Sequence, residues 1–162
     1  MEVTPELVER EYAWVRQRDD RIVELINEVR SDFEAIFGLA VEPVDRADYR
    51  QEVDVVFTAG NLAVNVAGLV AILRNLDVTE DHPGFVVDEI LGRELAATIA
   101  GTQPLRTLGE ATFHYADIQV HGDGDDPAGL DDLEAALAAG FQERLPGWEW
   151  TERPSPFAVD QA

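Results

Sequence analysis

Apolar residues recur at alternating spacings of four and three positions near the start of the chain, and this repeat limits the fold more than any other feature. Eight of its nine positions are apolar. The nine positions are Val8, Tyr12, Val15, Asp19, Ile22, Ile26, Val29, Phe33 and Ile36. This spacing is typical of one face of an α-helix. With Thr4 as the N-cap and Gly38 as the C-terminal stop, it predicts a long helical arm over residues 4–37.

An unbroken helix of that length would extend about 50 Å at 1.5 Å per residue, which is longer than a domain of this size needs. Two interpretations are open. In the first, the arm reaches a neighbouring subunit, and its apolar seam forms the interface of a homo-oligomer. The interface residues would then be Val15, Ile22, Ile26, Val29 and Phe33. In the second, the helix breaks between Arg16 and Arg21, and two shorter helices pack within one domain.

The excess of acidic over basic residues indicates that the protein works in concentrated salt. The chain carries 33 Asp and Glu residues against 12 basic residues, all of them Arg, and its formal net charge is −21. Carboxylates at this density repel one another at low salt, whereas molar salt shortens the Debye length to about 3 Å or less. The composition resembles that of proteins from halophilic archaea and their viruses, which implies a virion or the cytoplasm of a halophilic host. The acidic residues 1–6 do not resemble a secretion signal.

Composition also disfavours several classes of function. Without Cys the chain cannot form disulfides or thiolate metal sites. Its arginines are scattered among more than twice as many carboxylates, which disfavours direct nucleic-acid binding. The longest apolar run, residues 62–73, is too short to span a bilayer, so no membrane contact is expected. Neither Ser31 nor Ser155 lies in a strand-turn-helix elbow. We therefore predict no catalytic residue and no cofactor.

The rest of the chain combines alternating and helical patterns. Period-two alternation predicts strands at residues 52–57, 111–120 and 148–150. Helical spacing predicts helices at residues 62–76, 86–99 and 130–145. Together these elements predict one α+β domain over residues 1–150, with four to five helices and a small, mostly antiparallel sheet. An extended tail is expected at residues 151–162.

Two small clusters are candidate sites. His114 and Asp117 precede an acidic loop whose possible metal ligands are His121, Asp123, Asp125 and Asp126. Because about one residue in five is acidic, such clusters arise by chance, and we expect a solvated turn without a metal. The alternative is a small metal-dependent enzyme or ligand-binding domain centred on this region. Near the C-terminus, Trp148 and Trp150 would either anchor a protein interface or cover the end of the core.

The element order supports one resemblance. A strand at 113–120, an acidic loop, a helix at 130–145 and a short strand at 148–150, beneath a long N-terminal helix, resemble the small α+β connector and tail-completion proteins of tailed viruses. In that family, rings of subunits join head to tail or cap the tail tube without catalysis. The resemblance implies a non-catalytic structural protein that forms a homo-oligomer and contacts other structural proteins, as a head–tail connector or tail-completion component.

Overall fold

Helices make up most of the described structure. The computed structural model describes residues 2–38, 41–75, 82–101, 106–120 and 128–147. Its elements are α1 (Pro5–Gln17), α2 (Asp19–Phe37), α3 (Arg46–Phe57), α4 (Asn61–Asn75), α5 (His82–Ala100), α6 (Arg106–Val120) and α7 (Ala128–Gln142). Within these ranges no residue is in a strand. The predicted α+β class is therefore wrong, and the described part of the chain is all-helical.

The predicted strand at residues 52–57 lies in α3. Tyr49, Val53 and Val56 are buried and follow the helical period, whereas Val55, which the strand pattern placed beside Val53, is 46% exposed. The Asp45 carboxylate caps the helix by accepting a hydrogen bond from the Asp48 backbone N–H at 2.8 Å. Six alternating residues are too few to distinguish a strand from a helix. The first turn of α3 and its cap, which would have indicated a helix, lie before this window.

The predicted strand at residues 111–120 lies in α6. Leu108, Thr112 and Ala116 are buried at intervals of four, while Ile118 is 58% exposed. The change of apolar phase in this segment reflects a helical face rather than a bulged strand. The predicted helices at 62–76, 86–99 and 130–145 are confirmed as α4, α5 and α7, with ends shifted by a few residues.

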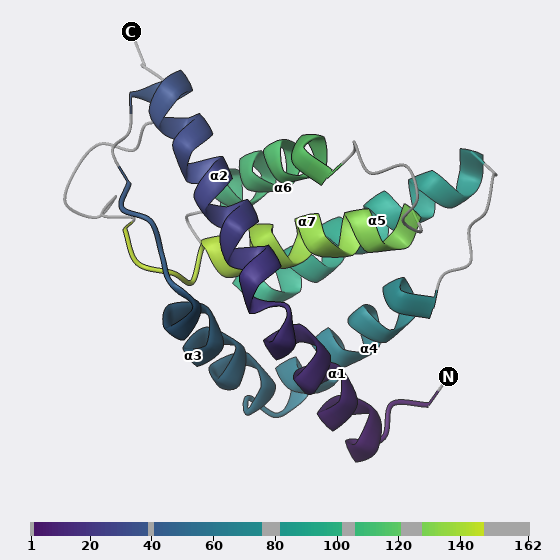
Figure 1. The fold of residues 1–162 in the computed structure, drawn as a ribbon. Helices are drawn as coiled ribbons and strands as arrows, with labels where there is room; N and C mark the ends of the chain where they lie inside the picture. The colour runs from purple at the N-terminus through teal and green to yellow at the C-terminus, as the bar shows by residue number, and fades with distance from the viewer. Residues whose placement is uncertain (1, 39–40, 76–81, 102–105, 121–127, 148–162) are drawn as a thin grey trace, which may run out of the picture.

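The N-terminal repeat forms two helices that meet at Arg18, as in the second of the two interpretations, and not one continuous arm over residues 4–37 (Figure 1). Asp19, the polar position of the repeat, begins α2, and its carboxylate accepts a hydrogen bond from the Asp20 backbone N–H and pairs with Arg50 of α3. The five seam residues are fully buried in the chain's own core: Val15, Ile22, Ile26, Val29 and Phe33. The seam is thus intramolecular packing, which corrects the prediction that these residues face a neighbouring subunit.

Helix α7 forms the centre of the molecule and contacts α2, α4, α5 and α6 (Figure 1). Its alanines 135, 136, 138 and 139 are fully buried and allow close packing on several sides. At Gly140, a Cβ atom would lie only 2.8 Å from the Ile99 Cβ of α5. Among the described helices, none alone is long and apolar enough to cross a membrane, and only α3 and α4 together, bent by 110°, meet that test.

Candidate functional site

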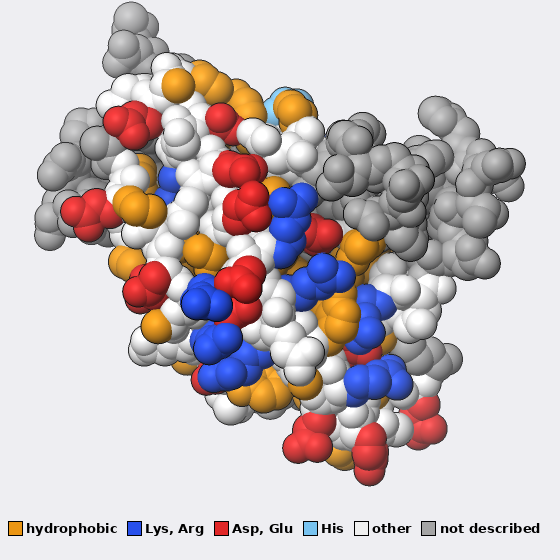
Figure 2. Space-filling view, in the orientation of Figure 1, with side chains coloured by type: hydrophobic (Ala, Val, Ile, Leu, Met, Phe, Trp, Pro, Cys, Tyr) orange, Lys and Arg blue, Asp and Glu red, His pale blue; other side chains and the backbone are white. Residues whose placement is uncertain are grey.

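Arginines gather on one side of the structure although they are scattered in the sequence. They lie on α1, at the start of α2, on α3 and at the end of α4, and Figure 2 shows several of them on the front of the molecule with carboxylates among them. We call this surface the arginine face. Its members are Arg10, Arg16, Arg18, Arg21, Arg46, Arg50 and Arg74. The face thus holds seven of the chain's 12 arginines.

Trp14 of α1 lies on this face, in contact with two of its arginines. Its partly buried indole packs against the hydrophobic core. The guanidinium groups of Arg18 and Arg74 lie 4.4 and 4.6 Å from the Trp14 ring centroid. Arg18 follows Trp14 by one helical turn, and Arg74 comes from the end of α4. Both contacts are cation–π interactions, which hold the two positive groups against one aromatic ring.

Carboxylates orient most of the other arginines. The buried Glu11 accepts a hydrogen bond from Arg74 Nη1 at 2.6 Å and from Arg10 Nε at 3.1 Å. Arg16 Nε donates to Asp54 Oδ1 of α3 at 3.1 Å, and the Tyr12 hydroxyl donates to the same oxygen. The hydrogen bond from Tyr12 to Asp54 is the main reason that the pKa of Tyr12 is raised above its ordinary value.

The first turn of α2 continues the face. Arg21 Nε donates to the buried Glu134 of α7 at 2.8 Å, and Arg46 lies 3.0 Å from Asp20. Across the whole face, six of the seven arginines pair with six carboxylates, and Arg18 contacts Trp14 instead. The carboxylates are Glu11, Asp19, Asp20, Glu24, Asp54 and Glu134. The charges of these paired groups therefore nearly cancel, whereas the chain as a whole carries a net charge of −21.

The arginine face keeps donors available for an external anion. A guanidinium has five N–H donors, and the ion pairs described above use one or two of them on each side chain. Arg10 is 60% exposed. Arg18 contacts Trp14, and no carboxylate among the described residues pairs with it. Arginines held in this way can bind carboxylates or phosphates in two-point contacts.

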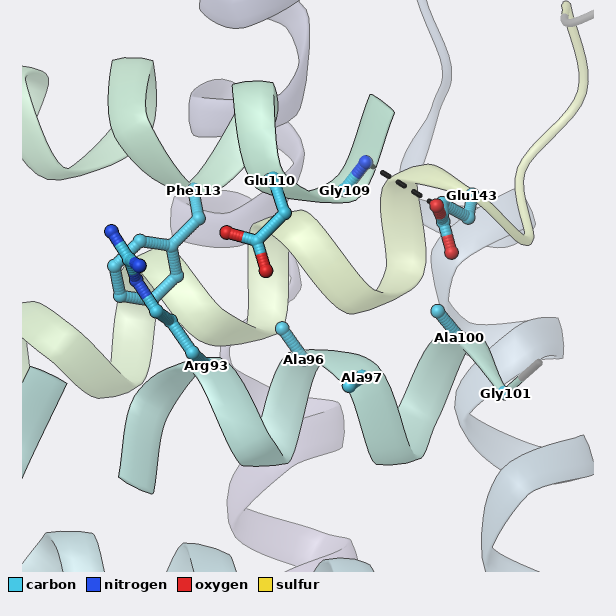
Figure 3. A pocket seen from close by; sticks show the side chains of 9 residues that line it. All are labelled: Arg93, Ala96, Ala97, Ala100, Gly101, Gly109, Glu110, Phe113 and Glu143. Carbon is cyan, nitrogen blue, oxygen red and sulfur yellow. Dashed lines mark hydrogen bonds between the residues drawn. The ribbon is translucent and has the colours of Figure 1, made fainter. Parts of the chain in front are cut away.

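A second feature is a hollow between α5 and α6, next to the end of α7 (Figure 3). Its empty space is about 330 Å³, including the part open to solvent. Alanine and glycine line most of it, and Arg93, Glu110 and Glu143 supply its charged groups. We call this hollow the α5–α6 slot.

The predicted site residues have different outcomes. Of the possible metal-binding region, His114 is exposed and packs edge-on against Tyr115, and Asp117 lies partly buried on α6. The remaining candidates lie outside the described residues: His121, Asp123, Asp125, Asp126, Trp148 and Trp150. Within the described ranges there is no group of three His, Asp or Glu side chains that could hold a metal ion.

Sequence reasoning missed the arginine face and Trp14. One signal was present, because four arginines lie between positions 10 and 21, and Arg18 follows Trp14 at the four-residue spacing that places side chains together on a helix. The contributions of Arg50 and Arg74 had no local signal, since they reach this surface only through the packing of α3 and α4 against α1 and α2.

Fold and surface together define an acidic, predominantly helical domain whose arginines are concentrated on one face. The chain belongs to a family described as a domain of unknown function, DUF7984, whose model matches residues 1–161. Comparison with curated proteins finds no match, and neither does comparison with solved structures.

Proposed function

We propose that this protein is a non-catalytic assembly protein whose copies associate head to tail, with the arginine face of one copy on an acidic surface of the next. The observation that supports this most directly is that seven arginines lie on one side of a chain of net charge −21, two of them against Trp14. A second copy provides acidic surface at the same concentration as the arginine face, and the guanidinium donors that the ion pairs leave unused can bind its carboxylates.

Salt should favour this assembly. At low ionic strength two copies of charge −21 repel each other over a long range, which opposes every contact between them. Molar salt screens that repulsion, but it weakens ion pairs less once they are buried in an interface. The proposal therefore predicts monomers in dilute buffer and oligomers in molar KCl.

The type of contact determines the type of assembly. A face that binds a different surface of the next copy gives a heterologous interface, which closes into a ring or continues as a filament. A ring would suit a virion connector or tail-completion component. The resemblance to such components was based on an element order that included a strand at 113–120, and these residues belong to α6. The element order therefore no longer supports an assembly role, and the proposal depends on the charge distribution alone.

The test is the absolute mass of the protein by light scattering in about 3 M KCl, compared with the Arg18→Glu variant. We expect a discrete oligomer for the unmodified protein and a monomer for the variant, because Arg18→Glu places a carboxylate beside Trp14 on the arginine face. A double variant, Ser31→Glu with Gln51→Glu, adds the same negative charge at exposed positions outside the face, and it should assemble normally. A monomeric unmodified protein, or an oligomeric Arg18→Glu variant, would contradict the proposal.

A further inference from the structure

The end of α2 and the neighbouring α6 carry exposed apolar side chains. Ile36 and Phe37 of α2 are 53% and 40% exposed, and Ile118 of α6 is 58% exposed. Figure 2 shows hydrophobic side chains gathered along the upper edge of the molecule, over the end of α2. We call these three residues and the partly buried Tyr115 the α2–α6 patch. Apolar side chains that gather on a surface mark a contact with another segment or molecule.

Contacts between the two helices show which side of α2 the patch occupies. The rings of Phe33 and Tyr115 meet edge to face with their centroids 5.7 Å apart, and Gln119 Nε2 donates to Asp32 Oδ2 at 3.3 Å. Both α2 residues therefore face α6. Ile36 comes one helical turn after each of them, so it lies on the same side of α2.

Phe37 and Ile118 lie around the same contact. The Phe37 ring centroid is 5.7 Å from that of Phe33. Ile118 follows Tyr115 by one helical turn on α6. The patch is therefore one surface at the junction of α2 and α6, and its members are not scattered single residues.

The last described residue, Gly147, lies close to α2. A Cβ atom on Gly147 would lie 3.1 Å from Arg30 Nη1, and Arg30 comes six residues before Ile36 on the same helix. Six residues rise about 9 Å along a helix, and three extended residues span about 10 Å. Trp150 is the third residue after Gly147, and its long side chain adds to that reach. The segment that follows Gly147 can therefore bring Trp150 to the patch.

Residues 148–162 lie outside the described ranges, and their sequence suits a contact with an apolar surface. Trp148, Trp150 and Phe157 lie within ten residues of one another. Each aromatic side chain of this kind buries about 150–250 Å² when it packs. The family model matches residues 1–161, so most of this segment belongs to the same family domain as the helices.

We infer that residues 148–157 pack on the α2–α6 patch of the same chain, with Trp150 against Ile36. Attachment at Gly147 keeps this segment near the patch at an effective concentration in the millimolar range. A second copy has no such advantage, and its net charge of −21 opposes its approach. Of the two roles that the sequence left open for Trp150, this contact assigns the cover of the core. It forms within one chain and does not depend on head-to-tail assembly.

The fluorescence of Trp150 tests this contact. The chain has three Trp residues, so the double variant Trp14→Phe with Trp148→Phe leaves Trp150 alone. In about 3 M KCl, which screens the acidic surface, its emission maximum should lie at shorter wavelength than in the same protein unfolded by guanidinium chloride. Acrylamide should also quench the emission less in the folded protein, because a packed indole is shielded from water.

Two further substitutions in this single-Trp protein locate the contact. Ile36→Asp should shift the emission toward that of the unfolded protein and increase quenching, because it places a carboxylate in the patch. Ile90→Asp makes the same change on α5, at a side chain that is 60% exposed and outside the patch, and it should leave the emission unchanged. Far-ultraviolet circular dichroism should be the same for both variants, since both side chains lie on the outside of the helices.

Three results would contradict the contact. If Trp150 emits as it does in the unfolded protein, it is exposed to water and does not pack. If its emission is shifted but Ile36→Asp leaves it unchanged, Trp150 packs somewhere other than the patch. If the emission changes with protein concentration in parallel with the mass, Trp150 packs on a neighbouring copy instead of its own chain.

Discussion

Arg74 of α4 donates a hydrogen bond from Nη1 to the carboxylate of Glu11 on α1, at a distance of 2.6 Å. Glu11 is buried, and Arg10 binds its other oxygen at 3.1 Å. A buried carboxylate is costly to leave with too few partners, so this pair ties the end of α4 to α1 and holds Arg74 beside Trp14.

Replacing Arg74 by Met should therefore destabilise the fold. We expect a loss of about 2–3 kcal/mol, less than for a fully isolated buried charge because Arg10 still binds Glu11. The double variant Glu11→Met with Arg74→Met should recover most of that loss, since an apolar pair of similar volume needs no partner. Urea denaturation at constant KCl measures the free energy of unfolding of both variants. If the free energy of unfolding of Arg74→Met equalled that of the unmodified protein, the buried Glu11 carboxylate would not need Arg74 as a partner.

Tyr49 gives a pH-dependent prediction. Its buried hydroxyl donates to the Val15 backbone carbonyl at 2.7 Å, so Tyr49→Phe should cost about 1 kcal/mol at neutral pH. Burial, and after it the charge of Asp19, raises the pKa of Tyr49 well above its ordinary value. Because the folded-state pKa is the higher one, the unfolded chain releases the Tyr49 proton first, above about pH 10.

The stabilisation by Tyr49 should thus be complete below that pH and be lost as the pH rises toward the folded-state pKa. Comparing the free energies of unfolding of the unmodified protein and Tyr49→Phe between neutral pH and pH values above 10 isolates this effect. Arg30, whose pKa burial lowers to about 10, is present in both proteins and cancels. A difference that stays constant across this range would contradict the prediction.

Sequence reasoning succeeded where a helical pattern extended over three or more turns. The helices α4, α5 and α7 follow from patterns of this length, whereas the N-terminal repeat left a continuous arm and a break near Arg18 both open. It failed at residues 52–57 and 111–120, where short windows of alternating residues match a strand and a helix almost equally well. In α3 the deciding residue was Tyr49, which lies outside the window that suggested a strand.

The candidate sites were harder to predict because they depend on tertiary packing. Glu11 meets Arg74 across 63 positions, and Arg21 meets Glu134 across 113. No local pattern connects such pairs. The α5–α6 slot likewise depends on Glu143 approaching Gly109, and the apolar seam gave no sign by itself of whether it would be covered by the same chain or by another.

Close packing between α5 and α7 provides a prediction with a matched control. Gly140→Ala should destabilise the protein by about 1–3 kcal/mol, because the new methyl group would lie 2.8 Å from the Ile99 Cβ. Gly68→Ala on α4 makes the same change where the nearest atom, the Val3 Cγ2, lies at 3.5 Å. That variant should be neutral or more stable by up to about 1 kcal/mol, since Ala favours the helix over Gly. Equal effects in thermal unfolding would show that the close approach is absent.

The apolar repeat itself gives the last prediction. Ile26 is fully buried in the core, so Ile26→Asp would place an unpaired carboxylate among apolar side chains. A loss above about 4 kcal/mol is expected, which approaches the whole stability of a domain of this size. The control is Ile36→Asp, the same substitution on the same helix and in the same repeat, at a side chain that is 53% exposed.

Circular dichroism melting in molar KCl distinguishes the two interpretations of the repeat. We expect Ile36→Asp to keep a cooperative transition close to that of the unmodified protein, and Ile26→Asp to lose it. If Ile26→Asp instead stayed folded and only the oligomer dissociated, the seam would face a neighbouring subunit. The intramolecular packing of α1 and α2 would then be incorrect, and assembly would depend on the seam rather than on the arginine face.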